Sequence, residues 1–536
     1  MNDFEIKNGY CKILSLSSKL SDSNENFDTI KNAVRICKKY KLLGIELPNG
    51  EFPVFNNKAK KLFKKLLSAE MPALDYAYWR KYQNVLFNVD DLESFSILGD
   101  NTLLLADGLM GVFDFANIRT VKLQGITVDW LNPLYFVGEI TDISDKRITV
   151  KTDAQLQGNE PIVSFQNIDI KTNRQKGMSV FCNISSVKKE ANGQVSFTSE
   201  DTLGLSIGDG IIARYIYNYS PVMQFYSCRD VFIEDVTLNA GAGMGVVAHK
   251  CKNLSFKRYR DILSKDRVMS TNTDATHLIS CYGKVHFLDC EFEGMGDDAV
   301  NIHGFYLTVK EIMSQNSVLA YFESNCQSKY YDVPDCLDSI EFIDRNNLVP
   351  FANGEIIKVI EKADGIFEII FKDKLPEGLK TRMLLANTTK TAQLLFENCT
   401  VKNIRGRALL IQTRNAIIRN NIFEGCTGQG VHIDTADGWM ESIGTRNITI
   451  ENNKFIDCGY GITKYCDAVG VVVETEASEY AIGVHKNIII RNNYIKGKNT
   501  GIKLLCAENV ILSGNKFDGC SKEYDIEFCK NVIKNF

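Results

Sequence analysis

Three aspartates in two short motifs are the residues of this sequence best suited to chemistry. Asn-Thr-Asp stands at 272–274 and Gly-Asp-Asp at 296–298, so Asp297 follows Asp274 by 23 positions. If such a spacing makes one turn of a coil, the two motifs lie on neighbouring strands about 4.8 Å apart. Three carboxylates on one patch repel one another, which is typical of a catalytic or metal-binding site.

Glycoside hydrolysis needs one carboxyl as acid and a second as base or nucleophile. The apolar alternation after the second motif predicts that positions 297, 299, 301 and 303 point outward. Asp298 then reaches the surface only if the pair lies on a turn, which Gly294 and Gly296 allow. Mutual repulsion is expected to keep one of the three carboxyls protonated near neutrality, as a general acid requires.

The elements that must position these motifs are short repeats. Asn487, Asn509 and Asn531 follow one another at intervals of 22 residues, and each precedes a run of aliphatic residues. Short strands, Asn/Gly turns and this period predict an all-β protein, a right-handed parallel β-helix. The alternative, a leucine-rich horseshoe, lacks its Leu-x-x-Leu-x-Leu phrase here.

Four of the 16 cysteines end equivalent repeat phrases, namely Cys399, Cys426, Cys458 and Cys520. Residues that recur at one point of a repeat form a stacked interior ladder, where cysteine behaves as a small hydrophobic residue. We therefore expect buried free thiols. No CxxC or Cys/His ligand spacing indicates structural zinc, and the redox compartment stays open.

Two stretches interrupt the repeat with alternating strands and are predicted to be antiparallel, barrel-like β-insertions. Helical periodicity over 26–40 predicts a short N-terminal helix that caps the exposed end of the coil. The predicted organisation is an N-terminal cap with the first rungs (1–131), inserted β-domain one (132–217), central rungs with the aspartates (218–304), inserted β-domain two (305–393) and C-terminal rungs (394–536).

Composition excludes several classes of function. A net charge of −4 and a pI near 6.0 offer no basic surplus for nucleic acid or an anionic membrane. No apolar stretch approaches 18 residues, so no membrane span is expected. The first residues lack a signal peptide, so the protein is either intracellular or, if a signal peptide was removed, periplasmic or secreted.

Polar and aromatic residues near the motifs are candidates for sugar contacts. The predicted substrate-binding residues are Asn272, His277, His303, Arg407, Gln412, Asp434 and Trp439. Four of them have a stated structural alternative: His277 as a satisfied interior histidine, Arg407 and Gln412 as a solvated face, and Trp439 as a packed loop residue. Calcium, the other use of clustered aspartates, would suit a lyase, but 271–277 and 295–304 contain no Lys or Arg to act as its base.

The two aspartate motifs resemble those of inverting β-helix glycosidases. The polygalacturonase family is similar, but its Gly-His-Gly and Arg-Ile-Lys motifs are not found at the corresponding positions. The closer resemblance is to glycoside hydrolase family 110, the bacterial α-1,3-galactosidases of the blood group B-cleaving type. It is carried by Gly-Ile-Thr-Val-Asp-Trp at 125–130, by the stretches 272–277 and 294–304, and by Leu-Ile-Gln-Thr-Arg-Asn at 410–415.

This resemblance implies release of terminal α-1,3-linked galactose from a glycan, with inversion and without a metal or cofactor. By motif position Asp297 would be the acid, and Asp274 with Asp298 would hold the water. Inversion implies acid and base carboxyls roughly 6.5–9.5 Å apart. The expected partner is an oligosaccharide, and a homodimer is one expected assembly. The alternatives are a polygalacturonase-like hydrolase and a non-catalytic glycan-binding β-helix.

Overall fold

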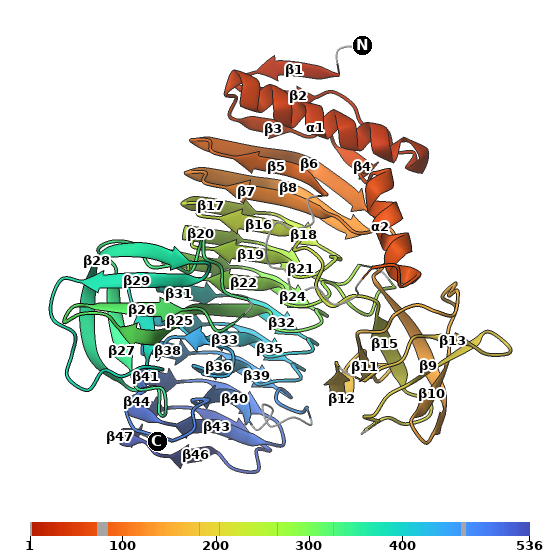
Figure 1. Cartoon of the computed structure of the whole chain (residues 1–536). Helices are drawn as coiled ribbons and strands as arrows, with labels where there is room; N and C mark the ends of the chain where they lie inside the picture. Colours follow the sequence, from red (N-terminus) through yellow and green to blue (C-terminus); the bar gives the residue numbers. More distant parts are fainter. Residues whose placement is uncertain are drawn as a thin grey trace.

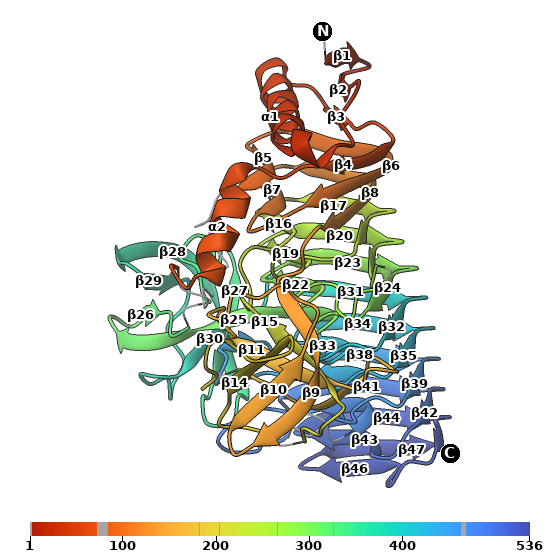
Figure 2. The same ribbon diagram turned by 90° about the vertical axis from the view of Figure 1, so that its right-hand side faces the viewer.

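The structure, a computed structural model, describes residues 3–71, 84–181, 183–202, 204–264, 266–324, 326–461 and 468–535. Its rungs stack along one axis, from β1 and α1 at one end to β46 and β47 at the other (Figures 1 and 2). The predicted parallel β-helix is confirmed. No helix among the described residues is both long and apolar enough to cross a membrane.

Two parallel sheet systems form the walls of the coil. The first has 23 strands. Together with the N-terminal helices they are β1 (Phe4–Lys7), β2 (Tyr10–Ile13), a 3-10 turn (Leu20–Asp22), α1 (Ser23–Tyr40), β3 (Gly44–Glu46), β4 (Gly50–Pro53), α2 (Asn57–Leu67), β6 (Ser94–Ala106), β8 (Thr120–Trp130), β17 (Asp230–Glu234), β18 (Thr237–Leu238), β20 (Lys252–Lys257), β21 (Arg260–Asp261), β23 (Tyr282–Leu288), β24 (Glu291–Glu293), β31 (Ala392–Glu397), β32 (Thr400–Lys402), β34 (Arg414–Arg419), β35 (Ile422–Glu424), β38 (Arg446–Glu451), β39 (Lys454–Ile456), β41 (His485–Arg491), β42 (Tyr494–Lys496), β44 (Ala507–Ser513), β45 (Lys516–Asp518) and β47 (Lys530–Asn535).

The second wall carries the site. Its parallel strands are β5 (Val85–Asp90), β7 (Gly111–Ala116), β16 (Met223–Tyr226), β19 (Val246–His249), β22 (Thr276–Ile279), β25 (Val300–Ile312), β33 (Leu409–Ile411), β36 (Val431–Ile433), β40 (Ala468–Val473), β43 (Thr500–Leu505) and β46 (Tyr524–Glu527). The short β37 (Glu441–Ser442) pairs antiparallel with β25, and Phe305 lies opposite Glu441.

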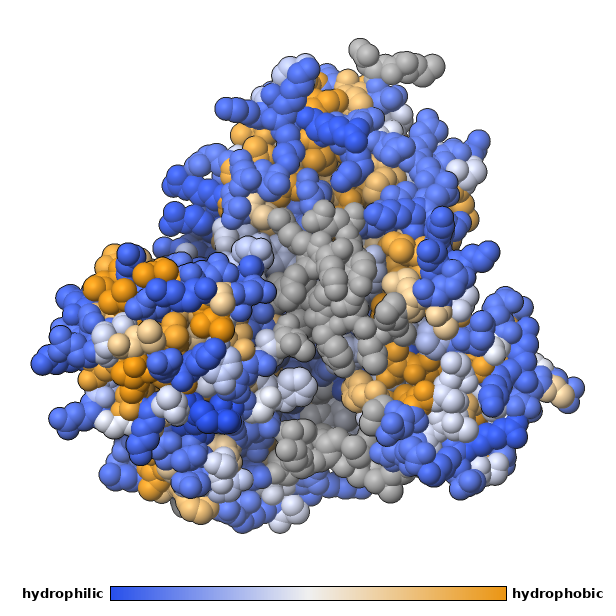
Figure 3. All heavy atoms as spheres, in the orientation of Figure 1, coloured by the Kyte–Doolittle hydropathy of each residue, from blue (hydrophilic) through white to orange (hydrophobic). Residues whose placement is uncertain are grey.

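Both interruptions of the repeat are antiparallel β-structures. The first forms a seven-stranded sheet of β9 (Tyr135–Ser144), β10 (Arg147–Lys151), β11 (Ser164–Ile168), β12 (Gln175–Val180), β13 (Lys188–Lys189), β14 (Gln194–Thr198) and β15 (Gly210–Arg214). The second closes on itself through β25, β26 (Ser317–Tyr321), β29 (Ile366–Phe371), β28 (Pro350–Ala363), β27 (Ser339–Ile343) and β30 (Leu384–Asn387). In Figure 3 the two insertions project as lobes on opposite sides of the coil.

Identical side chains stack between rungs and hold the coil together. In the core, the rings of Phe256 and Phe287 are parallel at 4.3 Å between centroids. At one interior turn, Asn421 donates from Nδ2 to Asn453 Oδ1 at 2.9 Å, and Asn453 donates in the same way to Asn493 at 3.0 Å. Each amide is therefore both donor and acceptor, so the ladder leaves no member unpaired. This is why the sequence repeats asparagine at that point.

The cysteines and the first helix also behave as predicted. All fourteen described cysteines are free, and Cys399, Cys426 and Cys458 are buried in the ladder. Burial raises the pKa of the Cys426 thiol well above its ordinary value, so this sulfur packs as a neutral group. Helix α1 covers the first rung with a buried apolar face that includes Phe27 and Ile30.

Candidate active site

In-register stacking places Asp274, Asp298 and Arg407 above one another. Each lies two residues before its strand, and β22, β25 and β33 pair in parallel with Thr276 beside Val300 and Val300 beside Leu409. Asp274 is thus in register with Asp298 rather than with Asp297. Asp274 and Asp298 therefore place two carboxylates on successive rungs, and Arg407 on the third rung supplies a positive charge.

Asp298 is buried and fully engaged by Arg407. The guanidinium donates from Nε to Oδ1 at 3.0 Å and from Nη2 to Oδ2 at 2.7 Å, and the Arg407 backbone N–H donates to Oδ1 at 2.7 Å. Gly406 permits this approach, because a Cβ there would lie 2.7 Å from Asp298 Oδ1. A two-pronged pair of this kind fixes both charge and orientation. Asp298 therefore acts as a fixed negative charge beneath Asp274.

Asp297 is half-buried and receives a hydrogen bond from Tyr217, whose hydroxyl donates to Oδ2 at 2.9 Å. Burial and the nearby carboxylates of Asp298 and Asp274 raise the pKa of Asp297 to about 8. The carboxyl therefore keeps its proton at neutral pH, as a general acid must. Tyr217 comes from the end of insertion one, where the Arg214 guanidinium lies 4.9 Å from its ring centre.

Asp274 is buried, and its Oδ2 lies 2.6 Å from His277 Nδ1. Burial, followed by the charge of Asp298, raises the pKa of Asp274 well above its ordinary value, while Arg407 opposes the shift. The three aspartates thus have three different environments. Asp298 is held by a cation, Asp297 by a tyrosine and Asp274 by a histidine.

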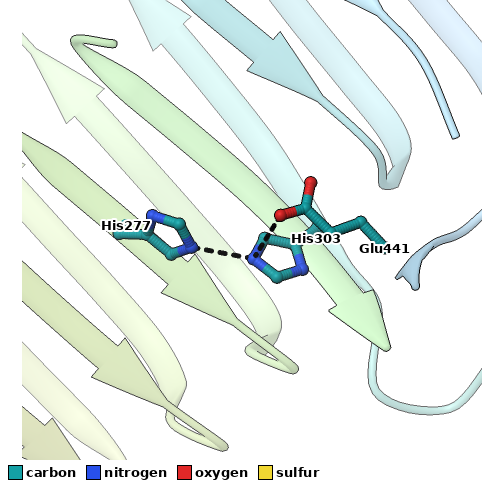
Figure 4. Close-up of side chains that lie close together, drawn as sticks. All are labelled: His277, His303 and Glu441. Carbon is teal, nitrogen blue, oxygen red and sulfur yellow. Dashed lines mark hydrogen bonds and ion pairs between the residues drawn. The ribbon is translucent and has the colours of Figure 1, made fainter. Parts of the chain in front are cut away.

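His277 contacts His303, which in turn lies near Glu441 (Figure 4). The two histidine Nε2 atoms are 2.8 Å apart, and Glu441 Oε1 lies 3.8 Å from His303 Nε2. Gln412 Nε2 donates to the other Glu441 oxygen at 2.6 Å, and His303 Nδ1 lies 2.8 Å from the Gly304 carbonyl oxygen. Burial lowers the pKa of both imidazoles, so neither ring holds a second proton easily.

The ligand atoms of His277, His303 and Glu441 lie within 4.8 Å of one another, which is close enough for a shared metal ion. Two nitrogens bound to one tetrahedral zinc at its usual bond length are separated by about 3.3 Å. The Nε2 atoms here are 2.8 Å apart, which is the distance of a hydrogen bond. The arrangement is therefore that of a hydrogen-bonded pair, and absence of a metal stays a prediction.

Asn272 is engaged within the protein. Its Nδ2 donates to the carbonyl oxygens of Ile216 at 2.6 Å and Tyr217 at 2.7 Å, and the side chain is buried. The backbone carbonyl oxygen of Asn272 accepts from Arg214 Nη1 at 2.7 Å. Asn272 therefore positions the segment that carries Tyr217, and its contact with sugar stays a prediction.

The other predicted contacts lie on or below the same face. Arg407 and Gln412 hold Asp298 and Glu441, respectively. Asp434 follows β36 one rung further on, where burial raises its pKa to about 7. Trp439 lies on the turn between β36 and β37 and is 63% exposed, so it is free to meet a ligand ring. These contacts to sugar remain predictions.

Tyr217 and Glu441 were missing from the predicted site residues. Tyr217 lies at the end of insertion one, outside the repeat, so no periodicity marks it. Glu441 is adjacent in sequence to the predicted Trp439 loop, and the pairing of β37 with β25 brings it to His303. A carboxylate on a loop that interrupts the repeat was the available signal for Glu441.

Comparison with known proteins gives two kinds of match. The family model described as "Right handed beta helix region" matches residues 386–463 and 442–535. Among solved structures, the A-module of mannuronan C-5 epimerase AlgE6 from Azotobacter vinelandii aligns over 95% of this chain and 94% of its own, with 9% identity and a TM-score of 0.31. The catalytic domain of Agl-KA aligns over 97% and 69%, with 9% identity and a TM-score of 0.36.

Three curated relatives of this chain are named alpha-1,3-galactosidase. Alpha-1,3-galactosidase B of Bacteroides thetaiotaomicron is 24% identical over 435 residues, covering 76% of this chain and 70% of the relative. Alpha-1,3-galactosidase A of Akkermansia muciniphila is 29% identical over 281 residues, which is 51% of this chain and 46% of the relative. Alpha-1,3-galactosidase A of Shewanella woodyi is 22% identical over 519 residues, covering 91% and 82%.

Proposed function

We propose that this chain, which is related in sequence to proteins named α-1,3-galactosidase, is a glycoside hydrolase that releases terminal α-1,3-linked galactose with inversion. The resemblance predicted from the aspartate motifs is confirmed by those relatives. The substrates proposed are blood group B-type and linear α-galactosyl glycans. The exo mode, the stereochemistry and the residue roles are part of the proposal.

The observation that carries the proposal is that the three aspartate carboxyl groups have different partners and different exposure. Asp297 is the group that donates a proton, since its pKa of about 8 keeps it protonated and its carboxyl is the least buried of the three. It would protonate the glycosidic oxygen as the bond to the anomeric carbon breaks. Tyr217 orients the carboxyl toward that oxygen through its hydroxyl.

Asp274 is the proposed base. In an inverting reaction a water molecule attacks the anomeric carbon from the face opposite the leaving group while the base removes one of its protons. Asp298 cannot readily take that proton, because three donors from Arg407 occupy its oxygens. Its fixed charge instead stabilises the positive charge that develops on the sugar ring.

The position of the site favours binding of the terminal residue of a glycan. The motifs immediately precede the wall strands β22 and β25, and both insertions approach them there. Gln166 of insertion one donates to the Gly296 carbonyl at 3.0 Å, and insertion two begins within β25 itself. A site with an insertion on each side favours a terminal residue over the middle of a polymer. This supports exo action.

The test is galactose release from the α-1,3-galactosyl disaccharide and from the branched blood group B trisaccharide, each with and without EDTA. We expect release that EDTA does not change, with β-galactose as the first anomer seen by proton NMR. Comparing the two substrates sets the preference for branched or linear glycans. No release from either would contradict the galactosidase, and α-galactose as first product would contradict inversion.

A further inference from the structure

Two buried histidines connect Asp274 to Glu441 in one continuous array. Asp274 Oδ2 lies 2.6 Å from His277 Nδ1, and the two Nε2 atoms of His277 and His303 are 2.8 Å apart (Figure 4). We infer that His277 and His303 form a proton relay that removes the proton from Asp274 and makes this carboxyl available as a base, with Glu441 as the counter-charge. The inference rests on the proposed function.

Hydrogen bonding fixes how many protons the array holds. The Gly304 carbonyl oxygen can only accept, so His303 Nδ1, at 2.8 Å from it, carries a hydrogen. The two facing Nε2 atoms must share one hydrogen, because two lone pairs or two N–H groups at 2.8 Å would repel. His277 Nδ1 and Asp274 Oδ2 share another for the same reason. Asp274, His277 and His303 together therefore carry no net charge.

Three arrangements satisfy this count without making an imidazolate. In the first, Asp274 is protonated and both histidines are neutral. In the second, the proton has crossed to His277, giving a carboxylate beside an imidazolium. In the third, His277 is neutral again and the extra proton is on His303. Only the second and third arrangements leave Asp274 able to accept a proton from water.

Glu441 decides between the arrangements. Its Oε1 lies 3.8 Å from His303 Nε2, so its charge stabilises an imidazolium at His303. Gln412 holds the other oxygen of Glu441 at 2.6 Å and keeps the carboxylate in place. Without this charge, burial would favour the all-neutral arrangement, because it lowers the pKa of both histidines and raises that of Asp274.

The remaining charged groups around the array act in both directions. Asp298 favours a positive charge at His277, whereas Arg407 opposes it. The protonated Asp297 adds no charge at neutral pH. Arg407 in turn favours the ionised form of Asp274. Asp332 of insertion two adds a further favourable charge at His303. Negative charge therefore favours a proton on either ring, as a relay for a positive charge requires.

The transfer balances without another reactant. The O–H bond of Asp274 breaks as an N–H bond forms at His277 Nδ1, and the His277 Nε2–H bond breaks as one forms at His303 Nε2. Asp274 then takes a proton from water while the water oxygen bonds to the anomeric carbon. The glycosidic C–O bond breaks, its electron pair stays on the leaving oxygen, and Asp297 protonates that oxygen. Exchange of one proton through solvent restores the starting state.

The direct test does not depend on turnover. The full chain labelled with ¹⁵N-histidine reports the protonation of each ring nitrogen by NMR, with signals assigned from His277→Gln and His303→Gln variants. We expect His303 Nδ1 to be protonated and one strongly downfield proton to be shared between the facing rings. Two unprotonated Nε2 atoms, together with a stoichiometric metal in elemental analysis, would overturn the relay in favour of a metal site.

The functional test is the pH profile of kcat/KM for Glu441→Gln. Loss of the counter-charge shifts the population toward the arrangement in which Asp274 is protonated. Because all three arrangements hold the same number of protons, kcat/KM should fall by about tenfold across the neutral range. The acidic limb should not move upward, since the Glu441 charge itself raises the pKa of Asp274. His303→Gln should lower kcat/KM to a similar extent, and the double variant should add no further loss. Glu441→Asp should restore part of the original profile.

A matched control separates the relay from a structural role. His286 lies on β23 beside Glu397 at 3.1 Å, away from the array, and His286→Gln should leave the profile unchanged. An unchanged kcat/KM for Glu441→Gln, or losses that add in the double variant, would overturn the relay. If the unaltered chain releases no galactose, the proposed function fails, while the NMR experiment still decides where the protons lie.

Discussion

The asparagine ladder of the C-terminal rungs and the carboxylate stack of the central rungs use the same in-register geometry with opposite results. In the ladder, Asn421, Asn453 and Asn493 satisfy one another because each amide both donates and accepts. In the stack, Asp274 lies above Asp298, and carboxylates can only accept. The fold therefore has to add a cation, a tyrosine and a histidine pair. In-register stacking brings like side chains together. Stacked amides satisfy one another, whereas stacked carboxylates repel one another and need other partners, which is the arrangement proposed here as the reactive site.

The largest effect is expected at the proposed acid. Asp297→Asn keeps the shape and removes the proton, so galactose release should fall by about 10²–10⁴-fold while the β-rich circular dichroism spectrum is unchanged. Asp289→Asn, at an exposed left-handed turn position, is the matched control and should keep full activity. Wild-type turnover by Asp297→Asn would exclude this residue as the acid.

The carboxylate stack should depend on its single cation. Arg407→Met leaves Asp298 buried without a partner, which should reduce the free energy of unfolding by about 3–5 kcal/mol. Thermal and urea unfolding measure the loss. Adding Asp298→Asn removes the uncompensated charge and should recover much of it. An Arg407→Met protein as stable as the wild type would show that the stack tolerates its charges unaided.

The asparagine ladder should be less sensitive, because its groups are neutral. Asn453→Ala deprives the Asn421 amide and the Ile418 carbonyl of their buried partners and should cost about 1–3 kcal/mol in urea unfolding. Asn487 lies in the exposed outer ladder at φ 58°, and Asn487→Gly should cost less than about 0.5 kcal/mol. Equal losses at the two positions would contradict the argument from burial.

The smallest effect is a shift of the basic limb of activity. The acid works only while protonated, so kcat/KM should fall as the pH rises through the Asp297 pKa of about 8. The Tyr217 hydrogen bond favours the charged form and lowers that pKa. Tyr217→Phe should therefore move the basic limb upward by about 0.5–1 pH unit. A limb that moves downward would contradict the assigned hydrogen-bond direction.

Pattern reasoning was right where one rung resembles the next. The asparagine period predicted the coil, the recurring cysteines predicted free buried thiols, and the two aspartate motifs were placed on adjacent rungs. Simple alternation was wrong within the second motif. It placed position 299 outward, but Ala299 is fully buried, whereas Asp298, which alternation placed inward, is indeed buried, against Arg407. A bend before β25 shifts the register there, and alternation assumes a straight strand.

The sequence by itself determined the repeat, the stacked ladders and the identity of the three aspartates, because these depend on local periodicity and on contacts between equivalent positions. Only the tertiary structure decided which aspartate is held by Arg407, which by Tyr217 and which by His277. Arg407 comes from another rung and Tyr217 from the end of an insertion, whereas His277 lies three residues after Asp274 and is turned back to it by the fold. The protonation of a buried carboxyl depends on such neighbours, which lie close in space and have no fixed spacing along the chain.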